Sequence, residues 1–229
     1  MKYVKCLIFV TGVVIFDSCQ PAVVFNEAQP VNVESLSEIP DAYRGIFWCP
    51  ADSASLFIDD KAFIKRKELL VKLTKAEVDS SNDLYLSNGR LFITEWEADF
   101  PAEEKGDTIV SQLIIRDTIF ALGPKQVLKD FKGHLVLSTK LDEGAWAVSV
   151  ASQTGKGILK IARADLPENL EALDSIVPIN SVSKINDRET QILIRPTKEQ
   201  FERILQKGVL FQGSCTEFER ILPIPHWEY

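Results

Sequence analysis

Histidine is scarce in this chain of 229 residues, which contains only His134 and His226. Many zinc hydrolases carry two histidines four residues apart on one helix, and these two lie far apart in the sequence. The chain also has no G-x-S-x-G motif, which holds the nucleophile of many esterases, and no complete phosphate-binding P-loop. These absences exclude the enzyme classes that the motifs define. We therefore expect no catalytic residue, no metal ion and no cofactor.

Positive charge and long hydrophobic runs are also in short supply. The chain has 26 Lys and Arg against 33 Asp and Glu, which gives a formal net charge of −7. Nucleic-acid-binding domains are usually basic, so we expect no nucleic-acid partner. The main uncharged apolar run, residues 6–16 (CLIFVTGVVIF), is shorter than the roughly 20 residues that a membrane-spanning helix needs. This run therefore predicts no permanent transmembrane anchor.

The first nineteen residues have the pattern of an export signal. Lys2 and Lys5 precede the apolar run, and Ser18 and Cys19 follow it. A basic start, a short apolar stretch and a small residue before a cleavage site define a secretory signal peptide. The tetrapeptide FDSC at 16–19 resembles the lipobox of bacterial lipoproteins, in which an apolar residue and two mostly small residues precede an invariant cysteine. Asp17 departs from that pattern.

This resemblance implies that residues 1–18 are a cleaved signal peptide and that Cys19 is acylated. Several acyl chains make anchoring effectively permanent, at about 0.8 kcal/mol per buried methylene. The partner implied is therefore a membrane, through the lipid on Cys19, in the bacterial cell envelope. By comparison with enteric lipoproteins, Gln20 gives no retention signal, which favours the outer membrane. A soluble secreted protein and a buried N-terminal strand remain open as alternatives.

Composition divides the rest of the chain into two parts. Residues 19–40 contain three prolines and several small polar residues, and this predicts a lipidated flexible tether. Residues 41–229 are predicted to form a single β-rich globular domain. Once Cys19 is acylated, the body retains Cys49 and Cys215. An exported protein meets an oxidising space, so these two cysteines are either a possible disulfide or two buried free thiols.

Hydrophobic alternation and turn residues predict a mainly β, β-rich α+β fold. Asn88-Gly89 between apolar runs is a strong signal for a two-residue hairpin turn. Such a turn places Leu84 and Leu86 on one, core-facing side of the hairpin and Tyr85 and Phe92 on the other. Further short strands at intervals of 8–12 residues predict an antiparallel barrel or sandwich.

The C-terminal quarter carries the helical signals. Thr197 and Gln200 form a capping-box pattern, and apolar residues follow at helical spacing until Gly208. This pattern predicts one C-terminal helix at about 197–207. A shorter helix is expected within 166–176, starting at Pro167.

Three functions of different class fit these features. The first is an exported, membrane-anchored lipoprotein with a non-catalytic structural or interaction domain. The second is a carrier of an apolar ligand, because YRGIFW at 43–48 resembles the G-x-W entry of lipocalins, which also begin a small barrel. The third is a glycan-active enzyme, in which Glu95 and Glu97 flank Trp96 on an extended strand as a pair of carboxylates.

Overall fold

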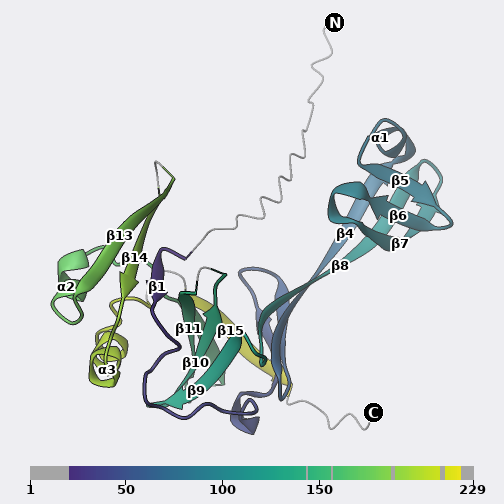
Figure 1. Ribbon diagram of the computed structural model, residues 1–229. Helices are drawn as coiled ribbons and strands as arrows, with labels where there is room; N and C mark the ends of the chain where they lie inside the picture. Colours follow the sequence, from purple (N-terminus) through teal and green to yellow (C-terminus); the bar gives the residue numbers. More distant parts are fainter. Residues whose placement is uncertain (1–20, 143, 156, 187–188, 212–214, 223–229) are drawn as a thin grey trace, which may run out of the picture.

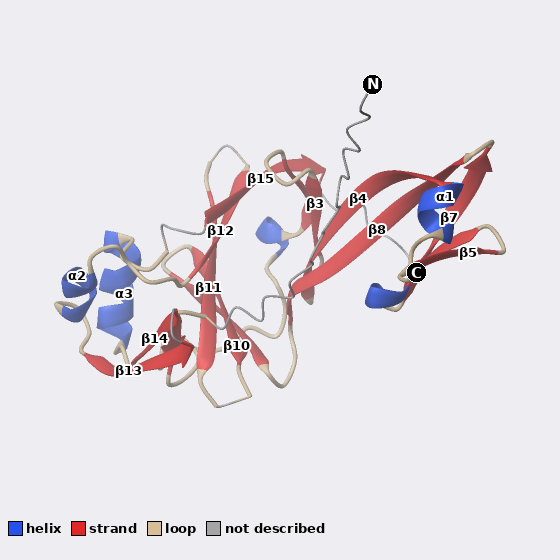
Figure 2. Ribbon diagram, turned by 90° about the horizontal axis from the view of Figure 1, so that it is seen from above, coloured by secondary structure: helices blue, strands red, loops and turns tan. Residues whose placement is uncertain are grey.

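The computed structural model describes residues 21–222, except 143, 156, 187–188 and 212–214. The described chain is mainly β, as predicted, with three short α-helices (Figures 1 and 2). The strands are β1 (Val23–Phe25), β2 (Gly45–Cys49), β3 (Ala54–Ile58), β4 (Ala62–Thr74), β5 (Leu84–Ser87), β6 (Arg90–Ile93), β7 (Ala98–Lys105), β8 (Thr108–Ala121), β9 (Gln126–Phe131), β10 (His134–Lys140), β11 (Trp146–Gln153), β12 (Ile158–Arg163), β13 (Ile179–Asn186), β14 (Glu189–Ile194) and β15 (Cys215–Leu222). The α-helices are α1 (Lys75–Asp79), α2 (Leu170–Asp174) and α3 (Lys198–Lys207), and the 3-10 helices are η1 (Asp41–Tyr43) and η2 (Thr94–Trp96).

The strands form one open sheet, so of the two predicted alternatives, barrel or sandwich, the closed barrel is not the one that the chain adopts. The strand order is β13-β14-β1-β11-β12-β15-β2-β3-β4-β8-β7-β6-β5, and β10 and β9 extend from β11. A barrel closes only when its first and last strands pair. Here β4 and β8 run 13 and 14 residues and carry the next strands away from the body. The pairs are antiparallel except β1 with β14, so the sheet is mixed.

The main hydrophobic core is formed by side chains from the strands of the body, from β2, β3 and β4 across to β9, β10, β11, β12 and β15. Alternation along the strands turns Phe47 and Cys49 of β2, and Leu56 and Ile58 of β3, to the same side. Each of these side chains is at most 1% exposed. The body is therefore held together by a filled apolar interior rather than by a lined ligand cavity.

Residues 21–40 do not form the predicted flexible tether. Val23 and Phe25 are fully buried, and β1 lies between β14 on one side and β11 on the other. Ile39 is also fully buried, and Leu36 bridges to Leu128 of β9. The apolar, β-branched run Val23–Phe25 favours a buried strand more strongly than the surrounding prolines favour a free linker.

Polar contacts hold the part of this segment that follows β1. The ammonium group of Lys129 donates to the carbonyls of Ala28, at 3.1 Å, and Pro30, at 2.8 Å. The backbone N–H of Gln29 donates to Ser138 Oγ at 3.1 Å. Lys129 is only 7% exposed, and its burial lowers its pKa. These contacts give the non-strand backbone of the segment the partners that a buried chain requires.

A second hydrophobic cluster joins β1 to β14, α2 and α3. The C-terminal helix lies where the sequence predicted it, with Thr197 as its N-cap in a capping box with Gln200 and Gly208 as its left-handed C-cap. Phe201 and Ile204 of this helix are fully buried. Helix α2 is shorter than its prediction and begins after Asn169, whose side chain caps it.

The long strands β4 and β8 form an arm that projects from the body (Figures 1 and 2). Helix α1 and strands β5, β6 and β7 form a small unit, here called the tip, at its end. The predicted hairpin is confirmed, since Asn88 and Gly89 have φ of 51° and 71° and Leu86 pairs with Leu91. A separate small cluster of buried side chains, Val78, Leu91 and Ile109, stabilises the tip.

The sequence left open whether Cys49 and Cys215 form a disulfide or are free thiols. In the structure, Cys49 is a free, buried thiol. Cys215 opens β15, and its side chain lies outside the described residues. The register pairs Trp48 of β2 with Glu219 of β15, which puts Cys215 three residues beyond the position opposite Cys49. Three strand residues span about 10 Å, whereas a disulfide needs Cα atoms within about 7 Å. The strand register therefore favours the free-thiol alternative.

Cys49→Ala is expected to lower the number of cysteines alkylated in denatured, unreduced protein by one. A free Cys49 contributes one alkylated side chain, and the substitution removes it. In a Cys49–Cys215 disulfide neither sulfur reacts, so the same substitution would release Cys215 and raise the count by one. Intact-mass measurement of wild type and variant shows directly whether the number of alkylated cysteines falls or rises. A rise would contradict the free-thiol assignment.

Candidate functional site

The two carboxylates of the enzymatic hypothesis do not lie on an extended strand. Glu95 belongs to the 3-10 helix η2, and Glu97 follows it with a left-handed φ of 49°. This turn breaks the alternation that would have placed both side chains on the same side of a strand, and both side chains are exposed. Trp96 packs edge-to-face on Phe100, with ring centroids 6.4 Å apart. The predicted pairing of the two carboxylates is therefore wrong.

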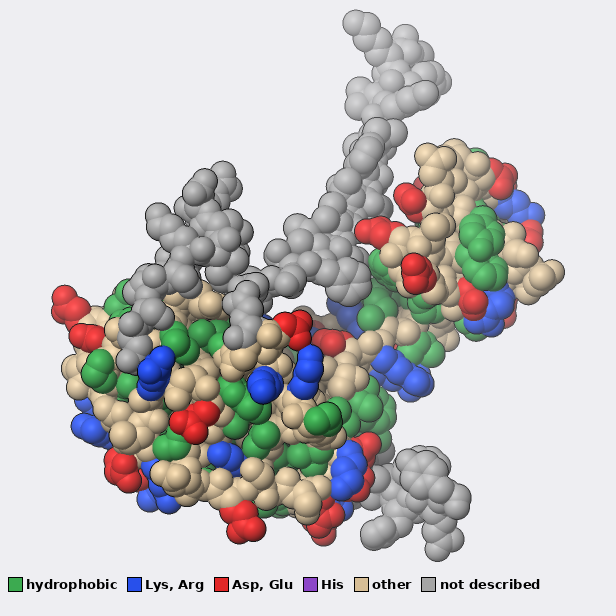
Figure 3. Space-filling model, in the orientation of Figure 1, with side chains coloured by type: hydrophobic (Ala, Val, Ile, Leu, Met, Phe, Trp, Pro, Cys, Tyr) green, Lys and Arg blue, Asp and Glu red, His purple; other side chains and the backbone are tan. Residues whose placement is uncertain are grey.

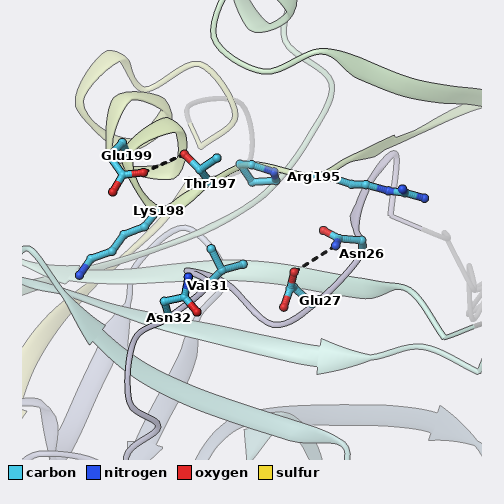
Figure 4. A pocket seen from close by; sticks show the side chains of 9 residues that line it. Asn26, Glu27, Val31, Asn32, Arg195, Thr197, Lys198 and Glu199 are labelled. Atoms are coloured by element: carbon cyan, nitrogen blue, oxygen red, sulfur yellow. Dashed lines mark hydrogen bonds between the residues drawn. The ribbon is translucent and has the colours of Figure 1, made fainter.

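A hollow of about 450 Å³ lies between the segment after β1 and the start of α3 (Figure 4). Arg195 and Lys198 extend away from each other rather than into its centre. Glu27 accepts a hydrogen bond from the amide of Asn26 at 3.1 Å, and Glu199 accepts one from Thr197 at 2.9 Å. Because its charged side chains point away from one another, this hollow does not bring catalytic groups together.

His134 is a half-buried histidine at the start of β10. Its Nδ1 is buried and has no hydrogen-bond partner within the described part of the chain. Burial lowers the pKa of His134, and the nearby Asp130 carboxylate only partly opposes this shift. The described residues contain no group of three or more His, Cys, Asp or Glu side chains placed to hold a metal ion. His134 thus acts as a neutral packing residue of the body.

The half-buried His134 is expected to make the fold less stable as the pH falls below about 6.5, the pKa of histidine in an unfolded chain. The unfolded chain takes up the proton first, because the folded pKa is lower, so stability is lost as the pH falls through the folded value. The His134→Gln variant should lose less stability than wild type between pH 7 and pH 5. Urea unfolding at a series of pH values measures this. Equal pH dependence in the two proteins would contradict the assignment.

The outer face of the tip carries an exposed aromatic pair. Tyr85 and Phe92 stack with ring centroids 4.6 Å apart and an interplanar angle of 4°. The side chain of Tyr85 is 52% exposed, whereas Leu91, on the opposite face of the same hairpin, is 1% exposed. The sequence predicted that Tyr85 and Phe92 share the face opposite the core, and the structure confirms it.

An ion pair borders the aromatic pair. Arg90 contacts the carboxylate of Asp99, and the ladder pairs Phe92 with Asp99 and Tyr85 with Phe92. Hydrophobic side chains at the tip lie among acidic and basic ones in Figure 3. We call Tyr85, Arg90, Phe92 and Asp99 the tip platform. An exposed aromatic centre with a charged rim is typical of protein–protein interfaces.

The chain matches none of the protein-family models, none of the curated proteins and none of the solved structures with which it was compared. Across residues 21–222, outside the gaps given above, no helix has the length and hydrophobicity to cross a membrane.

The remaining sequence predictions concern the lipidation site and the carrier of an apolar ligand. Cys19 lies outside the described residues, so the structure does not describe the predicted lipidation site. The carrier alternative depended on a closed barrel, and the open sheet does not supply one. Val148 and Val150 of β11 are at most 5% exposed, so this side of the strand packs into the interior. The tip platform is the feature of the described chain that best fits an interaction domain.

Proposed function

We propose that this protein is an exported, membrane-anchored lipoprotein whose non-catalytic domain binds a partner protein through the tip platform. The observation that carries the interaction is the stacked pair of Tyr85 and Phe92, half-exposed at the end of a projecting arm. Burying such rings against a partner gains apolar area at a low entropic cost, because each ring has only two side-chain torsions. The lipobox-like sequence ending at Cys19 supports the anchor and a place in the bacterial cell envelope, with the outer membrane favoured.

The arm makes the platform accessible. Strand β4 pairs with β3 as far as Lys67, and residues 68–74 continue beyond the body. At about 3.3 Å per residue, this continuation spans roughly 23 Å. Helix α1 packs on the core side of the tip, where Val78 is 4% exposed, and leaves the aromatic side uncovered by described residues. A partner can thus reach the platform without contacting the body.

The Cys19→Ala substitution is expected to abolish metabolic labelling with a fatty acid and to release the protein from membranes. The reason is that Cys19 is the proposed acceptor of the acyl chains, which supply the membrane affinity. Cys49→Ala is the control, because Cys49 is a buried thiol of the body and should keep wild-type labelling. Equal labelling of wild type and Cys19→Ala would overturn the anchor.

A photo-crosslinking residue at position 85 is expected to give a discrete adduct with one envelope protein in intact cells. Adding Phe92→Ser should weaken this adduct about tenfold or more, because truncating a central interface aromatic typically costs at least 1–2 kcal/mol. The same crosslinker at Leu170, which is 43% exposed on α2, is the control and should not give that adduct. Identical adducts from both positions would contradict a role for the tip platform.

A further inference from the structure

Two arginines face each other across the base of the arm. The β4–β8 ladder pairs Arg66 directly with Arg116, so both side chains emerge on the same face of the sheet. Opposite residues in an antiparallel pair have Cα atoms about 4.5–5.5 Å apart. Like charges placed directly opposite each other destabilise a sheet. This pair therefore calls for a compensating negative charge.

The described residues compensate only part of this charge. Arg66 Nη2 contacts Glu68 Oε1 at 2.7 Å, and the other oxygen of Glu68 accepts a hydrogen bond from Gln112 at 2.8 Å. Arg66 Nε is buried and has no acceptor in the part of the chain that the structure describes. The exposed Arg116 guanidinium has no acceptor among those residues either. Of the two cations, only Arg66 thus contacts a carboxylate, and its buried Nε–H is left over, which is costly without an acceptor.

The same row of the sheet adds a hydroxyl and an aromatic ring. Ser55 of β3 pairs with Arg66, and Trp48 of β2 pairs with Ser55. The side chain of Trp48 is 38% exposed. Neighbouring strands lie about 4.8 Å apart, so Trp48 stands roughly 10 Å from Arg66 with only the small Ser55 between them. One face therefore presents two guanidinium groups, a hydroxyl and an indole in a line, and the row ends at Glu219 of β15, on the far side of the indole from the arginines.

We propose that this face is a binding site for a phosphate monoester whose organic part lies over Ser55 against Trp48. The planar fork of a guanidinium matches a phosphate group with two parallel hydrogen bonds. A phosphate between Arg66 and Arg116 would neutralise their repulsion, and a small rotation of the Arg66 guanidinium would let its buried Nε–H donate to the phosphate. The organic part would gain contact with the exposed indole. This site lies at the base of the arm, apart from the tip platform, and does not depend on the proposed partner protein.

The test is a titration of the intact protein with inorganic phosphate and with phenyl phosphate, each against chloride at the same ionic strength. Both anions are expected to raise the melting temperature and to shift the NMR signal of Arg66 Nε–H, and phenyl phosphate should bind more tightly. Arg116→Gln should weaken both by about tenfold or more, because it removes a charged hydrogen-bonding partner. Its melting temperature without phosphate should be equal to or above that of wild type, because the repulsion is gone.

Two further variants make the test specific. Trp48→Leu should keep phosphate binding and lose the advantage of phenyl phosphate. Lys72→Gln removes a cation from the same strand and should bind both anions like wild type. Wild-type affinity in Arg116→Gln, or equal losses in Arg116→Gln and Lys72→Gln, would overturn the site. Binding to phosphatidic acid vesicles without any response to phenyl phosphate would overturn a soluble monoester as the ligand.

Discussion

Phe25→Ala is expected to lower the free energy of unfolding by about 3–5 kcal/mol, the usual cost of removing a buried aromatic side chain. Phe25 is fully buried, and its ring packs edge-to-face on Phe201 of α3 with centroids 6.3 Å apart. Its backbone lies between Ile194 of β14 and Trp146 of β11. The substitution therefore opens a cavity where two parts of the sheet and a helix meet. Urea unfolding followed by circular dichroism measures the loss.

The matched control for Phe25→Ala is Glu34→Ala in the same N-terminal segment. Glu34 is exposed, and replacing such a surface residue usually changes stability by less than about 0.5 kcal/mol. A flexible tether would tolerate both substitutions equally. Equal small effects would thus restore the tether that the sequence predicted, whereas a large effect confined to Phe25 supports the buried strand.

Leu91→Asp is expected to unfold the tip and leave the body folded. Leu91 is 1% exposed and belongs to a cluster with only two other buried side chains, Val78 and Ile109. An unpaired carboxylate in an apolar site costs several kcal/mol, which exceeds what so small a cluster can supply. The main body core is a separate cluster that includes Phe47 and Leu56, so it keeps its contacts.

Hydrogen exchange measured by mass spectrometry resolves the Leu91→Asp result by segment. Protection should be lost in β5, β6 and β7 and retained in β10 and β11, because local unfolding follows cooperative units. Tyr85→Ser, on the opposite face of the same hairpin, is the control and should keep protection in both regions. Loss of protection in β10 and β11 as well would show that tip and body unfold as one unit.

Local features were predictable from the sequence because their causes are local. The hairpin at Asn88-Gly89 requires two residues with positive φ, and the helix that starts after Thr197 is defined by a capping box. Barrel closure was not predictable, because it depends on which distant strands pair. Within β4, Leu69, Val71 and Leu73 alternate as in a strand, but Glu68 and Lys72 also suit an i,i+4 helical pair, so the sequence left this segment ambiguous. Composition favoured a linker at residues 19–40, whereas the short run Val23–Phe25 decided the outcome.

The candidate site was predictable only in part, for the same reason. Alternation along one hairpin placed Tyr85 and Phe92 on a shared face, and the structure confirms this. Arg66 and Arg116 meet only because β4 and β8 pair in one register along the arm from Ile64 to Thr74, and no local pattern predicts that register. The prediction for Glu95 and Glu97 failed for a different reason. It extended the alternation of a strand through residues that form a 3-10 helix and a left-handed turn.

The position of β1 decides how a mechanical force on the proposed anchor would enter the molecule. Cys19 lies four residues before Val23, and four residues span at most about 14 Å, so the proposed lipid on Cys19 would hold the body close to the membrane. Tension would pass directly into a strand that lies in parallel beside β14, with three residue pairs from Val23↔Ile192 to Phe25↔Ile194. A pull along that strand loads these contacts in shear, all together rather than one after another. Displacement of the body along the envelope would therefore be resisted by the hydrophobic interior around Phe25.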